Sequence, residues 1–265
     1  MSYSAEEGVA KTIRINSEER QNPSSTSSNR FNVNFGNNTG LMAINRVVVK
    51  HVSIPNVQYN VRPALGLNPV GNVFSYDNGS PQNITLTPGN YNINTIIFAL
   101  MADAQAISDG LTLVLNPLTL HIEFSSGVPI SYFSQASGNS MAKLFGIRTD
   151  SAPAVTEFTA PGLPDLSVHP NLYIASKTLS DGASMVSPTL GPLSVFAIIP
   201  INKPFGEILH YETQQEHLED IHFGSYSSGK SLQAIDIAVY DGDANLLDLQ
   251  GLDWTLIVRA YQVPT

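Results

Sequence analysis

The segment from Gly224 to Ser231 could bind a nucleotide, because it fits the P-loop pattern G-x-x-x-x-G-K-[ST] at every position. In such a loop, backbone N–H groups and the lysine hold phosphates, and a helix N-terminus that follows faces them. After Ser231, however, apolar and polar residues alternate, which predicts a strand over residues 232–240. We interpret the segment as a Gly/Ser loop that enters a strand, and Lys230 is not expected to contact phosphate. Nucleotide binding remains an alternative hypothesis.

An acidic segment that begins at Asp241 could bind calcium. Asp241, Asp243 and Asn245 supply oxygen ligands at the first, third and fifth places of a calcium-binding loop. The sixth place requires glycine and holds Leu246, and the twelfth requires glutamate and holds Leu252. The pattern therefore favours a hairpin-like turn over a calcium site.

A nearby group of histidines and acids could ligate a transition metal. Its members are His210, His217, His222, Glu216, Glu219 and Asp220. The group contains no H-E-x-x-H motif, which would place two imidazoles on one helix face around zinc. We interpret it as a solvated acidic loop. We expect no metal site, no cofactor and no catalytic residue in this chain.

The composition is that of a β-rich chain with few charges. Charged residues make up 13% of the sequence, against roughly 25% in ordinary globular proteins. Low charge also suits a surface that neighbouring proteins cover, because interface cores are depleted in charged residues. The net charge is −9, and no basic stretch appears outside residues 31–66, so direct binding of nucleic acid is not expected.

The sequence also argues against secretion signals and covalent cross-links. Cysteine is absent, so neither a disulfide framework nor a thiolate metal site can form, and assembly in a reducing compartment is consistent with this. The N-terminal residues lack the basic and apolar regions of a signal peptide. No apolar run approaches the ~20 residues of a membrane span, so none is expected.

Patterning predicts a mainly β fold, a single jelly-roll sandwich with an inserted mixed α/β, β-rich domain. Residues 1–30 predict an N-terminal arm, because a short strand candidate at Thr12–Ile15 is followed by a polar Ser/Asn-rich run with nothing to bury. Residues 31–66 and 166–265 hold short strand patterns separated by turn residues, which favours the jelly roll. Residues 67–165 change in character and are the expected insertion.

Two stretches near the insertion carry further local signals. Apolar residues at helical spacing predict one helix from Ile93 to Ile107, with Asn92 as its N-cap. Residues 151–170 are rich in proline, alanine and glycine, a composition typical of a linker.

Several segments, taken in order, resemble one viral protein family. They are SIPNVQYNV from Ser53, NVF from Asn72 with ITLTPGNYN from Ile84, and a C-terminal pair, LQAIDIAVYD from Leu232 and GLDWTLIVR from Gly251. The set is similar to the minor capsid (penton) proteins of virophages and related double-jelly-roll DNA viruses. The resemblance extends over most of the chain from Ile44 to Tyr261.

This resemblance implies a structural protein and not an enzyme. Five copies would form a homopentamer at each vertex of an icosahedral capsid, surrounded by the double-jelly-roll major capsid protein. The insertion would project outward, where it could meet a host or giant-virus surface receptor. The protein would lie in the virion, at the capsid vertex, after assembly in the cytoplasm of the infected host cell. The alternatives are a nucleotide-binding protein that uses Gly224 to Ser231, and a carbohydrate-binding jelly-roll module with Tyr and Trp as stacking platforms.

Overall fold

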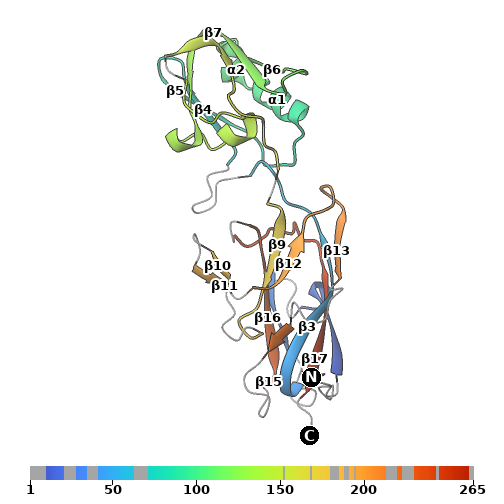
Figure 1. Cartoon of the computed structure of the whole chain (residues 1–265). Helices are drawn as coiled ribbons and strands as arrows, with labels where there is room; N and C mark the ends of the chain where they lie inside the picture. The colour runs from blue at the N-terminus through green and yellow to red at the C-terminus, as the bar shows by residue number, and fades with distance from the viewer. Residues whose placement is uncertain are drawn as a thin grey trace. The chain divides into compact units, whose positions relative to one another are not determined.

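The computed structural model describes most of the chain as two compact units. The described residues are 10–20, 28–34, 41–62, 71–151, 153–167, 169–179, 185–187, 191–193, 195–212, 220–222, 230–242 and 245–262. Unit 1 comprises Met1–Gln58 and His169–Thr265, and unit 2 comprises Tyr59–Val168 (Figure 1). The predicted limits of the insertion, 67 and 165, fall inside unit 2.

Unit 1 is an antiparallel sandwich of two sheets, as expected for a jelly roll (Figure 1). The first, called the β3 sheet, contains in spatial order β1 (Ala10–Asn16), β17 (Thr255–Gln262), β3 (Leu41–Pro55) and β13 (Ile208–Glu212), with β14 (Asp220–His222) and β15 (Lys230–Leu232) also paired to β3. The second, called the β16 sheet, contains β12 (Val195–Pro200), β9 (Asn171–Ala175), β16 (Ala234–Tyr240) and β2 (Arg30–Asn34). Strand β10 (Met185–Ser187) pairs antiparallel with β11 (Gly191–Leu193).

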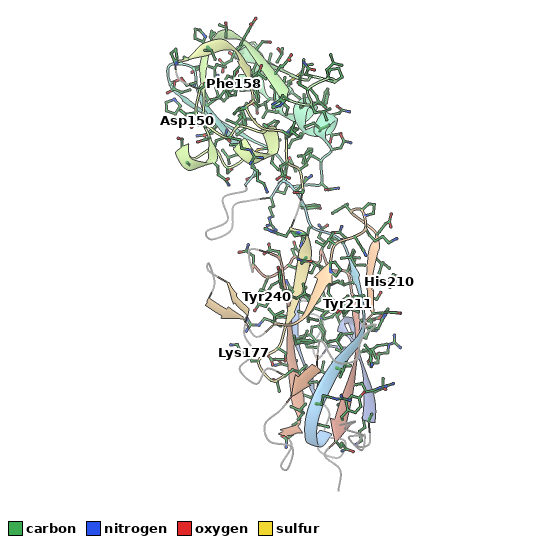
Figure 2. The ribbon with its side chains drawn as sticks, viewed as in Figure 1. Asp150, Phe158, Lys177, His210, Tyr211 and Tyr240 are labelled. Carbon is green, nitrogen blue, oxygen red and sulfur yellow. The ribbon has the colours of Figure 1, made fainter. Side chains whose placement is uncertain are left out.

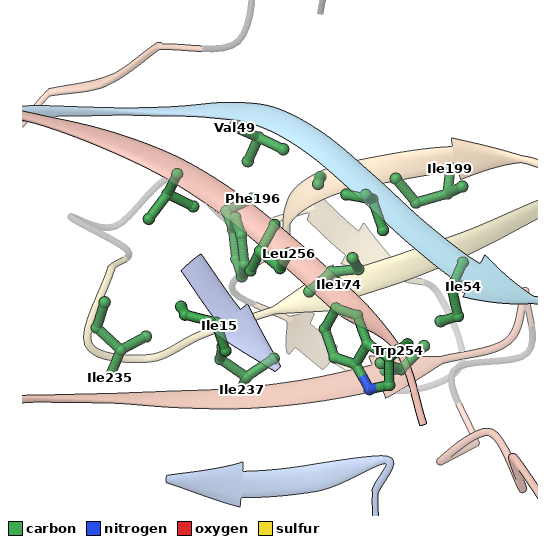
Figure 3. Close-up of a cluster of buried hydrophobic side chains, with 14 of the residues drawn as sticks. Ile15, Val49, Ile54, Ile174, Phe196, Ile199, Ile235, Ile237, Trp254 and Leu256 are labelled. Atoms are coloured by element: carbon green, nitrogen blue, oxygen red, sulfur yellow. The ribbon is translucent and has the colours of Figure 1, made fainter. Parts of the chain in front are cut away.

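The core of unit 1 lies between the inner faces of these two sheets. Period-two alternation directs every second side chain of each strand into it. Ile15 of β1, Leu256 of β17 and Ile237 of β16 all project into this one cluster (Figure 3). The indole of Trp254 is 3% exposed, meets the Phe31 ring edge-on with centroids 6.0 Å apart, and donates from Nε1 to the Ser28 carbonyl oxygen at 2.8 Å.

The N-terminal residues from 10 to 20 belong to this sandwich, so the prediction of an arm over residues 1–30 is wrong for them. Strand β1 pairs with β17 along its whole length, and Ile15 is 2% exposed. A 3-10 turn, η1 (Ser17–Glu19), follows, and the Ser17 N–H donates to the Trp254 carbonyl oxygen at 2.9 Å. The strand predicted from Thr12 to Ile15 is confirmed within β1, whereas its pairing with β17 at the other end of the chain is a tertiary relation that sequence pattern does not show.

Unit 2 is a second antiparallel sheet with its own core. Its strands are, in spatial order, β5 (Pro81–Thr85), β4 (Val73–Asp77), β7 (Ile122–Tyr132) and β6 (Thr112–Leu115), with β8 (Val155–Thr159) also paired to β7. Its helical elements are α1 (Ile93–Met101), α2 (Ala104–Ser108), η2 (Gln135–Ser137) and η3 (Ala142–Phe145). Strand β8 lies in the stretch 151–170, so the linker prediction is wrong there. Strand β8 forms because it pairs with β7, a long-range contact that a proline- and glycine-rich composition does not predict.

The predicted helix of unit 2 is interrupted. Asn92 is its N-cap, as predicted, because its Oδ1 accepts the Asn94 and Thr95 N–H groups at 3.0 and 2.9 Å. Asp103 then starts a second helix by accepting the Gln105 N–H at 2.8 Å, so one helix becomes α1 and α2. Ile107 is consequently 66% exposed. Within the described residues, no helix is long and apolar enough to span a membrane.

Replacement of Trp254 tests the importance of the core of unit 1. Trp254→Ala should lower the free energy of unfolding by about 3–5 kcal/mol, because the cavity and the unpaired Ser28 carbonyl are both buried. Guanidinium denaturation followed by circular dichroism measures the change. Trp254→Phe, which keeps most of the apolar volume, should cost less. An unchanged midpoint for the alanine variant would contradict the placement.

Candidate functional site

Strands occupy the positions where a P-loop would need a helix. Lys230–Leu232 is strand β15, paired antiparallel with β3, and Ala234–Tyr240 is strand β16, which confirms the predicted strand. Residues 223–229 lie outside the described residues. A P-loop holds phosphate at the N-terminus of the helix that follows its lysine. Here strands follow Lys230, so they provide no helix dipole for a phosphate.

The nucleotide hypothesis predicts a measurable difference at Lys230. We expect isothermal titration calorimetry of the full chain with ATP and Mg²⁺ to show no binding at micromolar concentrations. Lys230→Ala is expected to keep the wild-type melting temperature, and Lys203→Ala, at an exposed lysine between β12 and β13, is its control. Micromolar, Mg²⁺-dependent binding that only Lys230→Ala abolishes would overturn this interpretation.

The calcium-like segment forms a turn that hydrogen bonds between Asp241 and Asn245 hold together. The Asp241 side chain is 1% exposed. Its Oδ1 accepts the Asn245 N–H at 2.9 Å, and the Asp241 N–H donates to the Asn245 carbonyl oxygen at 3.0 Å. Asp243 lies outside the described residues. The first carboxylate of the supposed calcium loop is therefore committed to the backbone of a turn, as the sequence predicted.

Two other aspartates of the C-terminal motif hold distant segments of the chain. Asp253 Oδ1 accepts the Ser17 hydroxyl at 2.8 Å and the Arg20 guanidinium at 2.7 Å, which fastens the end of β1 to the start of β17. Asp236, on β16, accepts the backbone N–H groups of Lys177 and Thr178 at 3.1 and 2.7 Å, and the Thr178 hydroxyl as well. These carboxylates hold segments that are distant in sequence next to one another.

The environment of Asp236 changes its pKa. Burial alone raises the pKa of this carboxyl, but the hydrogen bonds from Thr178, Lys177 and Ser176 outweigh burial and hold the pKa below its usual value. The ionised form is therefore favoured by folding. Its contribution to stability is complete above the unfolded pKa of about 4, and it is lost as pH falls through the lower folded pKa.

The Asp236→Asn variant measures how much the ionised carboxylate contributes to stability. At pH 7 the variant should lose about 1–3 kcal/mol of unfolding free energy, because an amide nitrogen would face the N–H donors of Lys177 and Thr178. The difference from wild type should shrink as pH falls below about 4, because protonation of the carboxyl in the unfolded chain, and then in the folded one, removes the advantage of the ionised form. Denaturant titrations at several pH values measure it. Glu207→Gln, at an exposed carboxylate, should show neither effect, and an equal loss at pH 3 and pH 7 would refute the argument.

The structure brings His210 to a histidine that the sequence analysis missed. The rings of His210 and His51 lie 5.9 Å apart at an angle of 30°, and His51 Nδ1 lies 3.4 Å from Glu212 Oε1. Of the predicted cluster, Glu216, His217 and Glu219 lie outside the described residues. No local signal links residues 51 and 210, because only the pairing of β3 with β13 places them together.

This imidazole and carboxylate cluster is solvent-accessible. The His210 side chain points away from the sandwich, whereas the next residue, Tyr211, packs against the core (Figure 2). Among the described residues, no three His, Cys, Asp or Glu side chains form a group able to hold a metal ion. The cluster is therefore part of an exposed sheet surface.

Several large aromatic side chains lie in the hydrophobic cores, where they are not accessible to a sugar. Trp254 is in the core of unit 1. Phe74, Phe124 and Tyr132 belong to the core of unit 2, with the Phe124 and Tyr132 ring centroids 4.9 Å apart. Burial raises the pKa of Tyr132 to about 12, as expected for a phenol held in an apolar core.

Comparison with known proteins identifies a similar fold. No protein-family model matches the chain, and a search of curated proteins finds no significant match. Among solved structures, the crystal structure of the selenomethionine-labelled mavirus penton protein is similar, with a TM-score of 0.50 and 9% identity over 96% of this chain and 99% of that chain. The chain thus shares the fold of a penton protein along nearly its whole length.

Proposed function

We propose that this chain is a structural minor capsid protein that self-associates as a pentamer at the vertices of an icosahedral virus. The observation that carries the proposal is the shared fold with the mavirus penton protein, which extends over 96% of this chain. Because both chains are matched almost completely, the likeness takes in unit 2 as well as the jelly roll. The ordered sequence segments that resemble virophage pentons support the same role independently.

The chemistry of the described residues is consistent with a building block. Asp241 of the calcium-like segment is engaged in internal hydrogen bonds, as are Asp236 and Asp253. Unit 1 also displays large apolar side chains on its surface, namely Ile198, Phe205, Ile208, Leu246 and Leu252, which are 38–51% exposed. Burial of such side chains between subunits is the main favourable term in stable protein association.

Unit 2 is the part that we propose faces other molecules. Leu118 is 92% exposed in the turn between β6 and β7, and Phe98 on α1 is 72% exposed. Large apolar groups that remain in water at such turns are typical of binding surfaces. A receptor on a host or giant-virus surface is the proposed partner of unit 2, and the double-jelly-roll major capsid protein is the proposed partner of unit 1.

The pentamer can be tested on the purified full-length protein. Sedimentation equilibrium between about 1 and 100 µM should show a species of five chain masses, and negative-stain electron microscopy should show five-fold rings. Cyclic closure is expected because a repeated head-to-tail interface with the right rotation forms a ring. A monomer at all concentrations, or a dimer with two-fold symmetry, would reject the pentamer.

A further inference from the structure

We propose that Asn78 is a site of slow self-modification, at which the folded chain converts its own asparagine into aspartate and isoaspartate. The residue lies in the turn between β4 and β5 of unit 2 and is followed by Gly79. The two residues form the one Asn-Gly pair of the sequence. The reaction takes place within unit 2, needs only water from outside, and is independent of the proposed self-association.

The chemistry is an attack by a backbone nitrogen on a neighbouring side chain. The Gly79 nitrogen bonds to Cγ of Asn78, the Cγ–Nδ2 bond breaks, and ammonia leaves with the proton that the Gly79 nitrogen gives up. The cyclic succinimide that results takes up one water molecule, which opens it at Cγ to give aspartate or at the backbone carbonyl to give isoaspartate. Nothing is oxidised or reduced. Because the chain itself is consumed, the reaction is a single event without turnover.

The turn places a carboxylate on the attacking nitrogen. The Gly79 N–H donates to Asp77 Oδ1 at 2.7 Å. A backbone amide is a poor nucleophile until its proton is removed, and a carboxylate within hydrogen-bond reach accepts that proton as a general base. Asp77 therefore takes the part of the base in this reaction.

The side-chain carbonyl of Asn78 is polarised by several donors. Its Oδ1 accepts the Gln82 amide at 3.2 Å and, more weakly, the N–H and the hydroxyl of Ser80, both at 3.4 Å. This oxygen gains negative charge as the nitrogen attacks, and donors already aimed at it stabilise that charge. Asn78 Nδ2 donates to Asp109 Oδ1 at 2.9 Å, which fixes the orientation of the amide.

Gly79 leaves the attack unobstructed. Its φ is +107°, and no heavy atom lies within 4 Å of the place that a Cβ would take. Without a side chain on this residue, its nitrogen can approach Cγ of Asn78 with little steric resistance. Gly79 and Ser80 are both exposed, so water can reach the succinimide.

Two other asparagines of unit 2 provide internal comparisons. Asn83 on β5 is also exposed, but Ile84 follows it, and a side chain branched at Cβ hinders the approach of the nitrogen. Asn139 is buried, and its amide is held between the Met141 N–H and the Phe133 carbonyl oxygen. Neither site should react on the timescale of Asn78.

Conversion of Asn78 changes a buried hydrogen-bond network. Asp109 is buried and also accepts the Tyr76 hydroxyl at 2.6 Å. In the aspartate product, a carboxylate replaces the amide that donates to Asp109 Oδ1, so two negative groups face each other. In the isoaspartate product, the backbone of the turn is longer by one carbon. Both products should therefore destabilise unit 2.

The experiment follows the peptide that contains Asn78 by mass spectrometry while the full-length protein is kept folded at 37 °C and neutral pH. Asn78 should gain the mass of an NH-to-O exchange at least about tenfold faster than in the same chain unfolded in guanidinium, because only the folded turn holds the base in place. Asn83 and Asn139 should stay unchanged over that time.

A conservative substitution tests the base directly. Asp77→Asn keeps an acceptor for the Gly79 N–H but cannot take its proton, so it should slow the reaction at least about tenfold. The remaining rate should rise more steeply with pH than that of wild type, because hydroxide must then remove the proton. Glu157→Gln, the same type of change at an exposed carboxylate of β8, is the matched control and should keep the wild-type rate.

Each outcome has a distinct meaning. Circular dichroism melting checks the fold of each variant, and Asp77→Ser replaces Asp77→Asn if the latter does not fold. Conversion of Asn78 that is no faster in the folded chain than in the unfolded one, or that the loss of the Asp77 carboxylate does not slow, would overturn the proposal and leave the proposed capsid role standing. Asn78→Asp should melt below wild type, and an unchanged melting temperature would contradict the effect on the Asp109 network.

Discussion

The sandwich of unit 1 depends on contact between the two ends of the chain. Strand β17 lies between β1 and β3, so the β3 sheet is incomplete until the last strand has paired with the first. The Asp253 carboxylate, which accepts the Ser17 hydroxyl and the Arg20 guanidinium, and the buried Trp254 indole fasten this junction. These contacts close a loop of more than two hundred residues, whose entropic cost grows only slowly with length. Unit 2 lies within that loop and has a core of its own.

The chain uses its carboxylates as structural acceptors. Asp109 in unit 2 accepts the Tyr76 hydroxyl at 2.6 Å and the Asn78 amide at 2.9 Å, and these bonds, with one from Gln105, outweigh burial and lower the pKa of its carboxyl. Asp236 serves a similar purpose in unit 1. An ionised group with several donors stabilises one arrangement of its neighbours, because any alternative leaves a partly buried charge unpaired.

The low charge of the chain is compatible with the proposed self-association. Charged residues make up 13% of the sequence, and a low content of charge would leave room for neutral and apolar contacts between subunits. In the proposed ring of identical subunits, a single repeated interface would have to reject every other way in which two copies could meet.

The sequence by itself determined the β-rich class, the strand after the P-loop-like segment and the capped start of α1, because these follow from period-two alternation and local side-chain bonds at residues such as Ile235, Ile237 and Asn92. Only the tertiary structure decided that residues 10–16 complete a sheet, that β8 pairs with β7, and that His51 meets His210. Those relations join segments far apart in the chain. Periodicity is a local property that shows which face of a strand is apolar, whereas strand order and register are settled by how all the apolar faces are buried together.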